Sequence, residues 1–221
     1  MDFFNLHTHK YTDNPAITEL VNQYPWAFET KIPFYSIGIH PWYIKEERLE
    51  SDLKTIGDKL ALPQCLALGE CGLDKRIEVP MELQITVFEK QIALAEHYQK
   101  PLVLHLVAAF DELLAIKKRM KISVPIIIHG FSKNEQVAQQ LFDTGFYLSF
   151  GKYLLRNPEL KAVFQSVPND RFFLETDTIE ETLNDVYTLA ANYKGMNLAE
   201  MQRQVANNWT SVFKYVTSSD L

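Results

Sequence analysis

The chain has 221 residues, 47% hydrophobic and 23% charged, a composition typical of a single globular domain that would span residues 1–221. Its net charge of −6 argues against broad non-specific binding to nucleic acid, which needs a basic surface, but leaves room for a small local phosphate site. The sequence shows neither a signal-peptide pattern nor an apolar run long enough to span a bilayer. We therefore expect a cytoplasmic protein with no membrane partner and no obligate protein partner.

Apolar segments alternate with helical patterns along the chain. The predicted strands cover residues 3–9, 34–39, 65–70, 102–105, 125–129, 146–150 and 172–176, and residues 17–22 are a candidate eighth strand. Helices are predicted within residues 81–100, 108–120, 134–146 and roughly 197–217. Strands that are apolar on both faces and separated by helices indicate a parallel sheet. Their number favours the α/β class, as a (β/α) TIM-type barrel, over an open doubly wound sheet.

One corner of this predicted barrel is short. Only 24 residues separate His9 from Phe34, too few for another strand and two full helices. We therefore expect an abbreviated unit between the first and third strands. Elsewhere, Cys65 and Cys71 lie in one short segment, and without an export signal they are expected to be free thiols in a reducing compartment.

The first predicted strand ends in two histidines, within "NLHTH". Residues two apart on a strand point to the same face, so His7 and His9 project together. Two neutral imidazoles that converge on one point are the beginning of a metal site. Taken alone, the pair also fits a half-buried strand with a polar end.

Four more chemical groups fall at predicted strand ends. They are Glu70, His105, His129 and Asp177. In a (β/α) barrel the C-terminal ends of all strands meet at one mouth, so six groups would share one rim. Four imidazoles and two carboxylates suit zinc, manganese, cobalt or nickel. Six ligands exceed the needs of one tetrahedral ion, but they suit two ions that share a bridging carboxylate and activate a water, with a carboxylate as general base.

Each of these residues also has an ordinary structural explanation. His105 and His129 could be polar residues of the rim, Glu70 could cap the next helix, and Asp177 could be an N-cap. The coincidence of six such groups at strand ends favours the metal site. His40 is expected either to support a ligand from behind or to be a turn residue before Pro41.

The motifs "NLHTHK", "GIHPW", "ALGECGLD", "HLVAAFDE", "HGFS", "YLSFG" and "LETD" occur in this order from residue 5 to 177. In this order they resemble the successive motifs of the TatD family of metal-dependent hydrolases, which belong with the amidohydrolase-type barrels. The most specific stretch is "GECGLD", residues 69–74, followed by Gln84, Val87, Phe88 and Gln91. The C-terminal "NNWTSVF" also resembles the closing segment of the family.

The resemblance implies a hydrolase with two divalent ions per chain, and known members of the family act as deoxyribonucleases. The ions could be zinc, manganese, magnesium, cobalt or nickel. By resemblance, His7, His9 and Asp177 bind one ion, His105 and His129 bind the other, and Glu70 bridges them. Asp177 is also the expected general base.

The chain departs from the family on the side that would face substrate. Leu106 and Val107 replace the usual Ser-Arg, and residues 178–180 replace the usual Ala-Pro-Tyr. Arginine suits bidentate phosphate binding, so its loss weakens the case for DNA. Lys10 and Lys152, each at a strand end, are the candidate replacement cations for substrate binding.

Three functions remain open from the sequence. The first is a phosphodiesterase or deoxyribonuclease that uses a metal-bridged water and acts on DNA or another phosphoester. The second is a metal-dependent hydrolase of a small ester, cyclic amide or lactone. The third is a degenerate, non-enzymic binding protein, which the complete set of ligands disfavours.

Overall fold

The computed structural model describes residues 3–213. These residues form two compact units, one of residues 3–21 and 129–213 and the other of residues 22–128. The expectation of one domain over residues 1–221 stays a prediction. Among the described residues, every helix is too short or too polar to cross a membrane.

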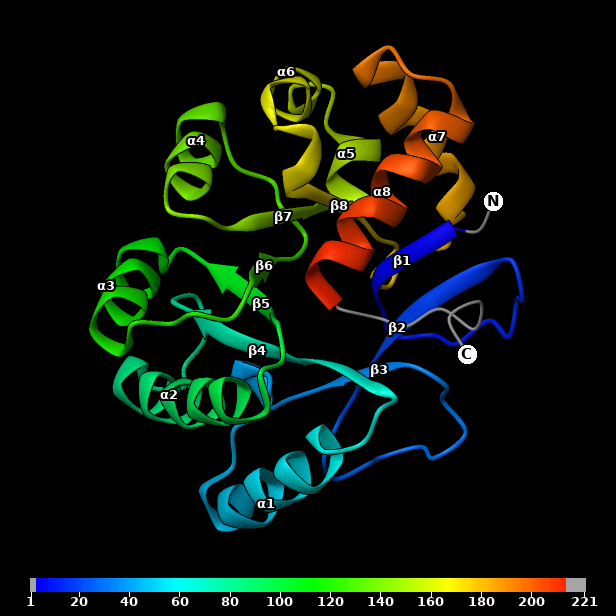
Figure 1. The fold of residues 1–221 in the computed structure, drawn as a ribbon. Helices are drawn as coiled ribbons and strands as arrows, with labels where there is room; N and C mark the ends of the chain where they lie inside the picture. Colours follow the sequence, from blue (N-terminus) through cyan, green and yellow to red (C-terminus); the bar gives the residue numbers. More distant parts are fainter. Residues whose placement is uncertain (1–2, 214–221) are drawn as a thin grey trace. The chain divides into compact units, whose positions relative to one another are not determined.

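The unit of residues 22–128 contains four parallel strands in chain order. They are β3 (Tyr35–Ile37), β4 (Cys65–Asp74), β5 (Leu102–Val107) and β6 (Ile126–Ile128), each paired with the next. The helices are α1 (Leu49–Leu60), α2 (Met81–Tyr98) and α3 (Phe110–Met120), with the short 3-10 turns η1 (Pro41–Tyr43) and η2 (Glu46–Arg48). Helix α2 lies along β4, whose ten residues are all buried (Figure 1). Burial on both faces is what a parallel strand with helical cover requires.

The unit of residues 3–21 and 129–213 joins the two ends of the described chain. Its strands are β1 (Phe3–Thr8), β2 (Ile17–Gln23, here up to Val21), β7 (Tyr147–Phe150) and β8 (Phe172–Leu174). Strand β1 pairs in parallel with β2, β7 pairs in parallel with β8, and Thr8 bridges to Asp177 just beyond β8. Pairing of the first strand with the last is the connection that closes a barrel.

Helices cover the outside of these strands. They are α4 (Glu135–Asp143), α5 (Lys152–Arg156), α6 (Leu160–Ser166), α7 (Leu183–Lys194) and α8 (Leu198–Phe213), with the turn η3 (Asn169–Arg171). Helices α7 and α8 pack against β1 and β8 (Figure 1). The buried Trp209 of α8 contacts Phe4 of β1, with ring centroids 5.1 Å apart. This contact fixes the strand that carries the paired histidines.

Most of the predicted elements are confirmed. The candidate strand at residues 17–22 exists as β2, and the structure has no helix between Thr8 and Tyr35, so the corner is abbreviated as expected. The last predicted helix is present to Phe213, while residues 214–217 lie outside the described part. The predictions that strands end at Glu70 and at His105 are wrong, because β4 continues to Asp74 and β5 continues to Val107.

Two glycines explain how β4 continues past Glu70. The register of β4 against β5 shifts between Leu68 and Cys71, where Gly69 and later Gly72 have φ angles of +153° and +135°. A Cβ atom on either glycine would overlap a carbonyl oxygen of β5. Only glycine fits this irregular stretch, which re-aims the side chain of Glu70 within the strand.

We expect both thiols to be inert in the folded protein. Cys65 and Cys71 are free and fully buried, and burial raises the pKa of Cys65 to about 12 and that of Cys71 well above its usual range. Because the thiolate is the reactive form, a disulfide reagent at pH 8 should label neither cysteine in the native protein. Denatured protein should give two thiols per chain as the control. Rapid labelling before denaturation would contradict the buried placement.

Candidate metal centres

A first cluster of possible ligands lies in the unit that pairs β1 with β8. His7 and His9 come from the end of β1, and Asp177 follows β8. The Asp177 Oδ1 atom lies 3.8 Å from His7 Nε2 and 3.5 Å from His9 Nε2. The His7 side chain is fully buried, whereas His9 and Asp177 are 27% and 25% exposed. The cluster is therefore anchored on one side and open to solvent on the other.

Main-chain bonds hold Asp177 in this cluster. Its N–H donates to the His7 carbonyl (2.9 Å), and its carbonyl accepts from the His9 N–H (3.3 Å). The φ angle of Asp177 is +53°, a left-handed conformation that Asp tolerates better than most residues. Non-glycine residues held in this way are concentrated at functional sites. The main-chain hydrogen bonds between the end of the first strand and the segment after the last strand thus position the three candidate ligands.

His129 and Glu175 lie beside this cluster. The His129 ring centroid is 4.3 Å from that of His7, and its Nδ1 atom is 3.4 Å from Glu175 Oε1. Burial raises the pKa of Glu175, but the neighbouring His129 and the charge of His7 outweigh this effect and lower the pKa. Glu175 also accepts a 2.8 Å bond from the Gly130 N–H. An ionised carboxylate that orients a histidine ring is typical of metal sites.

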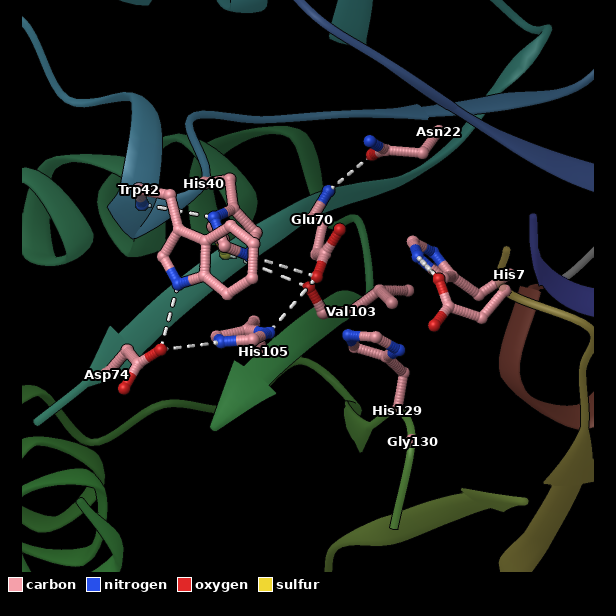
Figure 2. Close-up of polar contacts among 12 residues, drawn as sticks. His7, Asn22, His40, Trp42, Glu70, Asp74, Val103, His105, His129 and Gly130 are labelled. Atoms are coloured by element: carbon pink, nitrogen blue, oxygen red, sulfur yellow. Dashed lines mark hydrogen bonds and ion pairs between the residues drawn. The ribbon is translucent and has the colours of Figure 1, made fainter. Parts of the chain in front are cut away.

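A second cluster lies in the unit of residues 22–128. Glu70 Oε1 is 3.2 Å from His40 Nε2 and 3.3 Å from His105 Nδ1 (Figure 2). Glu70 comes from the irregular stretch of β4, His105 from β5, and His40 directly precedes η1. All three side chains are largely buried.

His40 lies in the turn before Pro41, and its role as a support for a metal ligand stays a prediction. Its Nδ1 accepts from the Trp42 N–H (3.1 Å), which caps the turn that begins at Pro41. That bond directs Nε2 toward Glu70. His40 could have been grouped with the other candidate ligands, because it too follows an apolar strand.

Asp74 and Trp42 orient the second cluster and were not predicted. Trp42 Nε1 donates to Asp74 Oδ2 (2.8 Å), and the same oxygen is 3.3 Å from His105 Nε2 (Figure 2). Burial raises the pKa of Asp74, but hydrogen bonds from Trp42, the Arg76 N–H and His105 outweigh it, so the pKa is lowered. An ionised Asp74 favours a proton on His105 Nε2 and leaves Nδ1 to face Glu70.

Both clusters have a donor set suited to a divalent ion. Each combines two imidazoles with one carboxylate, and the ligand atoms of each cluster lie within 4.8 Å of one another. Nitrogen and oxygen donors in this ratio suit zinc, manganese, cobalt, nickel or iron(II). We name them the His7 triad (His7, His9, Asp177) and the Glu70 triad (His40, Glu70, His105). The pairing of His129 with His105 on one ion, and the bridging role of Glu70, stay predictions.

The two lysines proposed for substrate binding line separate cavities. Lys10 lies with His9 and Asp177 on a cavity of about 710 Å³, which also includes Glu19 and Glu180. Lys152 lines a cavity of about 490 Å³. Arg156 lines that second cavity as well, but it makes a two-oxygen ion pair with Glu181. The structure therefore brings Lys10, but not Lys152, into one cavity with residues of the His7 triad.

Parallel β/α elements whose C-terminal halves and following loops carry imidazole–carboxylate triads define the class of metal-dependent hydrolase barrels. The sequence pattern of the family described as TatD related DNase matches residues 2–214. The chain therefore belongs to the TatD family of metal-dependent hydrolases.

Particular relatives agree with this assignment. A metal-dependent hydrolase YabD of Bacillus subtilis, described as uncharacterized, is 33% identical over 172 residues, which cover 75% of this chain and 65% of that protein. The chain thus matches just under two thirds of that relative. The 3'-5' ssDNA/RNA exonuclease TatD of Klebsiella pneumoniae is 33% identical over 121 residues, 52% of this chain and 46% of that protein.

A solved structure shows the fold. The TatD homologue YJJV of Escherichia coli K12 has a TM-score of 0.81 at 20% identity and covers 97% of this chain and 98% of its own. This similarity confirms the predicted (β/α) TIM-type barrel.

Proposed function

We propose that the chain is a metal-dependent phosphodiesterase that acts on nucleic acid, with DNA as the first candidate substrate. The observation that carries the proposal is the His7 triad, whose partly exposed Asp177 shares a cavity with Lys10. The relative from Klebsiella pneumoniae named as an ssDNA/RNA exonuclease supports the substrate class. Several other relatives are described only as uncharacterized metal-dependent hydrolases.

In this proposal each residue of the site has a separate role in hydrolysis. A bound divalent ion supplies Lewis acidity and lowers the pKa of the attacking water. Asp177, which is partly exposed beside the histidines, would accept the proton that this water releases. Lys10 supplies a positive charge on the wall of the same cavity. Glu175 and Asp74 hold the His129 and His105 rings in fixed orientations.

The chain also carries features that favour a small, uncharged substrate. The usual arginine is replaced by Leu106 and Val107, and Leu106 is buried. The cavity beside the His7 triad is lined by Glu19 and Glu180, which repel phosphate, and a volume of about 710 Å³ suits a small molecule. Hydrolysis of a small ester, cyclic amide or lactone is therefore the second candidate function.

One set of assays separates these functions. The protein, reconstituted with each of several divalent ions, is tested on a single-stranded oligonucleotide, a duplex, and small esters and lactones. Turnover of the oligonucleotide, abolished by a chelator, supports the first proposal. Turnover of a neutral ester or lactone without action on DNA supports the second. Metal binding without turnover of any substrate would support the non-enzymic alternative.

Lys10→Ala should raise the KM for a single-stranded oligonucleotide more than it lowers kcat. Lysine attracts phosphate as a mobile point charge, so we expect a change of up to about fivefold at low salt that shrinks as salt rises. Steady-state kinetics at two salt concentrations measure it. Lys54→Ala, which removes an exposed charge from α1, is the matched control. Wild-type kinetics for Lys10→Ala at both concentrations would exclude a phosphate role.

A further inference from the structure

Helix α2 buries two glutamine side chains beside the strands that carry the Glu70 triad. Gln84 and Gln91 are 0% and 1% exposed. They lie seven residues apart, which is close to two helical turns, so both point to the same face of the helix. A buried helix face usually consists of apolar side chains, because a buried amide must find a partner for each of its polar atoms. Both glutamines find these partners on the main chain around the triad.

Gln91 holds the residue that precedes His40. Its Oε1 accepts from the Ile39 N–H (2.7 Å), and its Nε2 donates to the Ile39 carbonyl (3.1 Å). Strand β3 ends at Ile37, so these two main-chain groups lie beyond the end of that strand. The glutamine thus makes the pair of bonds that one residue of a neighbouring strand would otherwise make. The bond to the carbonyl fixes the peptide that joins Ile39 to His40.

Gln84 holds Asp74 in the same way. Its Oε1 accepts from the Asp74 N–H (2.8 Å), and its Nε2 donates to the carbonyls of Asp74 (3.0 Å) and Val79 (2.7 Å). Asp74 is the last residue of β4, and its carboxylate contacts His105. Gln84 therefore ties both ends of the loop between β4 and α2, and it fixes the point from which Asp74 reaches the His105 ring.

A third buried amide supports the remaining member of the triad. Asn22 is 5% exposed, and its Oδ1 accepts from the Glu70 N–H (2.8 Å, Figure 2). The main chain behind each member of the Glu70 triad is thus bonded to a buried amide side chain, directly for Glu70 and through one other residue for His40 and His105. Two of these three amides come from one helix, which places two parts of the triad relative to each other.

We propose that Gln84 and Gln91 are positioning residues that set the affinity of the Glu70 triad for a divalent ion. An ion requires its ligands at fixed distances, and ligands that are held in place before binding lose less conformational freedom when the ion arrives. Because both amides project from one helix, they hold His40 and the carboxylate behind His105 together. The inference rests on the Glu70 triad as a metal site and does not depend on the identity of the substrate.

Zinc affinity, measured without substrate, tests the proposal. Gln84→Met and Gln91→Met keep nearly the length and volume of the side chain but remove its bonds to the main chain. Each should weaken the binding of at least one zinc ion per chain by about tenfold to a hundredfold, measured by competition with a chromophoric chelator. Gln91→Glu should recover part of this affinity, because its carboxyl group can still accept from the Ile39 N–H.

Val87→Ala is the control for a general loss of stability. Val87 lies between the two glutamines on the same face of α2 and is 1% exposed, but its side chain cannot form a hydrogen bond. This variant should melt at a lower temperature than wild type and keep wild-type zinc affinity. An equal loss of affinity in Val87→Ala, or wild-type affinity in both methionine variants, would overturn the proposal.

A second comparison repeats the two methionine substitutions in the Glu70→Gln variant. They should cause no further loss of zinc there, because the ion that they support is already gone. A further loss as large as in the wild-type background would show that the glutamines act elsewhere, and full zinc content in Glu70→Gln itself would remove the site; either result would overturn the proposal. Since these measurements contain no substrate, a lack of phosphodiesterase activity would count only against the proposed function.

Discussion

Asp177→Asn should lower turnover by on the order of 100-fold or more, far beyond any loss of bound metal. Asparagine keeps the size of the side chain and an oxygen that can face His7 and His9, but it cannot accept a proton from water. The main-chain bonds of residue 177 to His7 and His9 do not involve the side chain, so the local fold should persist. Single-turnover rates and elemental analysis of the same preparation measure the two effects.

The control for this variant is Asp143→Asn, at the end of α4. Asp143 accepts a bond from Gln139 that the asparagine oxygen can also accept. This variant should turn over like wild type. Near-normal turnover by Asp177→Asn would remove Asp177 from the role of general base.

Glu70→Gln should cause the largest loss of bound metal. The substitution leaves His40 and His105 in place but removes the negative charge between them. Two neutral imidazoles and an amide form a much weaker site for a divalent ion than two imidazoles and a carboxylate. Elemental analysis after dialysis gives the number of ions per chain, and activity should fall with it.

The number of ions lost shows whether Glu70 binds one ion or bridges two. Loss of about one ion relative to wild type supports the Glu70 triad alone. Loss of two supports the bridging role that the family resemblance implies. Unchanged metal content would exclude Glu70 as a ligand. Glu47→Gln, in the exposed turn η2, is the control and should keep full metal content.

The sequence predicted the positions of the strands, because burial in a parallel sheet leaves long apolar runs, but it placed the ends of two strands too early, at Glu70 and His105. The sequence also predicted that His7 and His9 project from the same face of the first strand. This prediction was possible because the alternation of side chains along a strand is a local property. The sequence could not predict that β4 continues past Glu70. The shift in register there depends on the fit of Gly69 and Gly72 against β5, a contact between distant parts of the chain.

The carboxylates behind the histidines were missed for a related reason. Asp74 reaches His105, 31 positions away, and Glu175 reaches His129. Both carboxylates follow apolar residues near strand ends, so their positions were visible in the sequence. The histidines that they contact could not be identified from the sequence. The orientation of a histidine ring depends on tertiary contacts, and these leave no periodic pattern in the sequence.

The joint between β1 and β8 also bears on when the His7 triad can form during synthesis. Thr8 and Asp177 are 169 positions apart, yet the main chains of His7, His9 and Asp177 are bonded directly. A nascent chain that has emerged only as far as α6 already carries both histidines but lacks the carboxylate. Because the entropic cost of closing a loop rises with its length, we expect the contact between β1 and the segment after β8 to form late, and metal uptake by this triad would then coincide with the docking of the last strand. Catalytic competence and completion of the fold would then be acquired together.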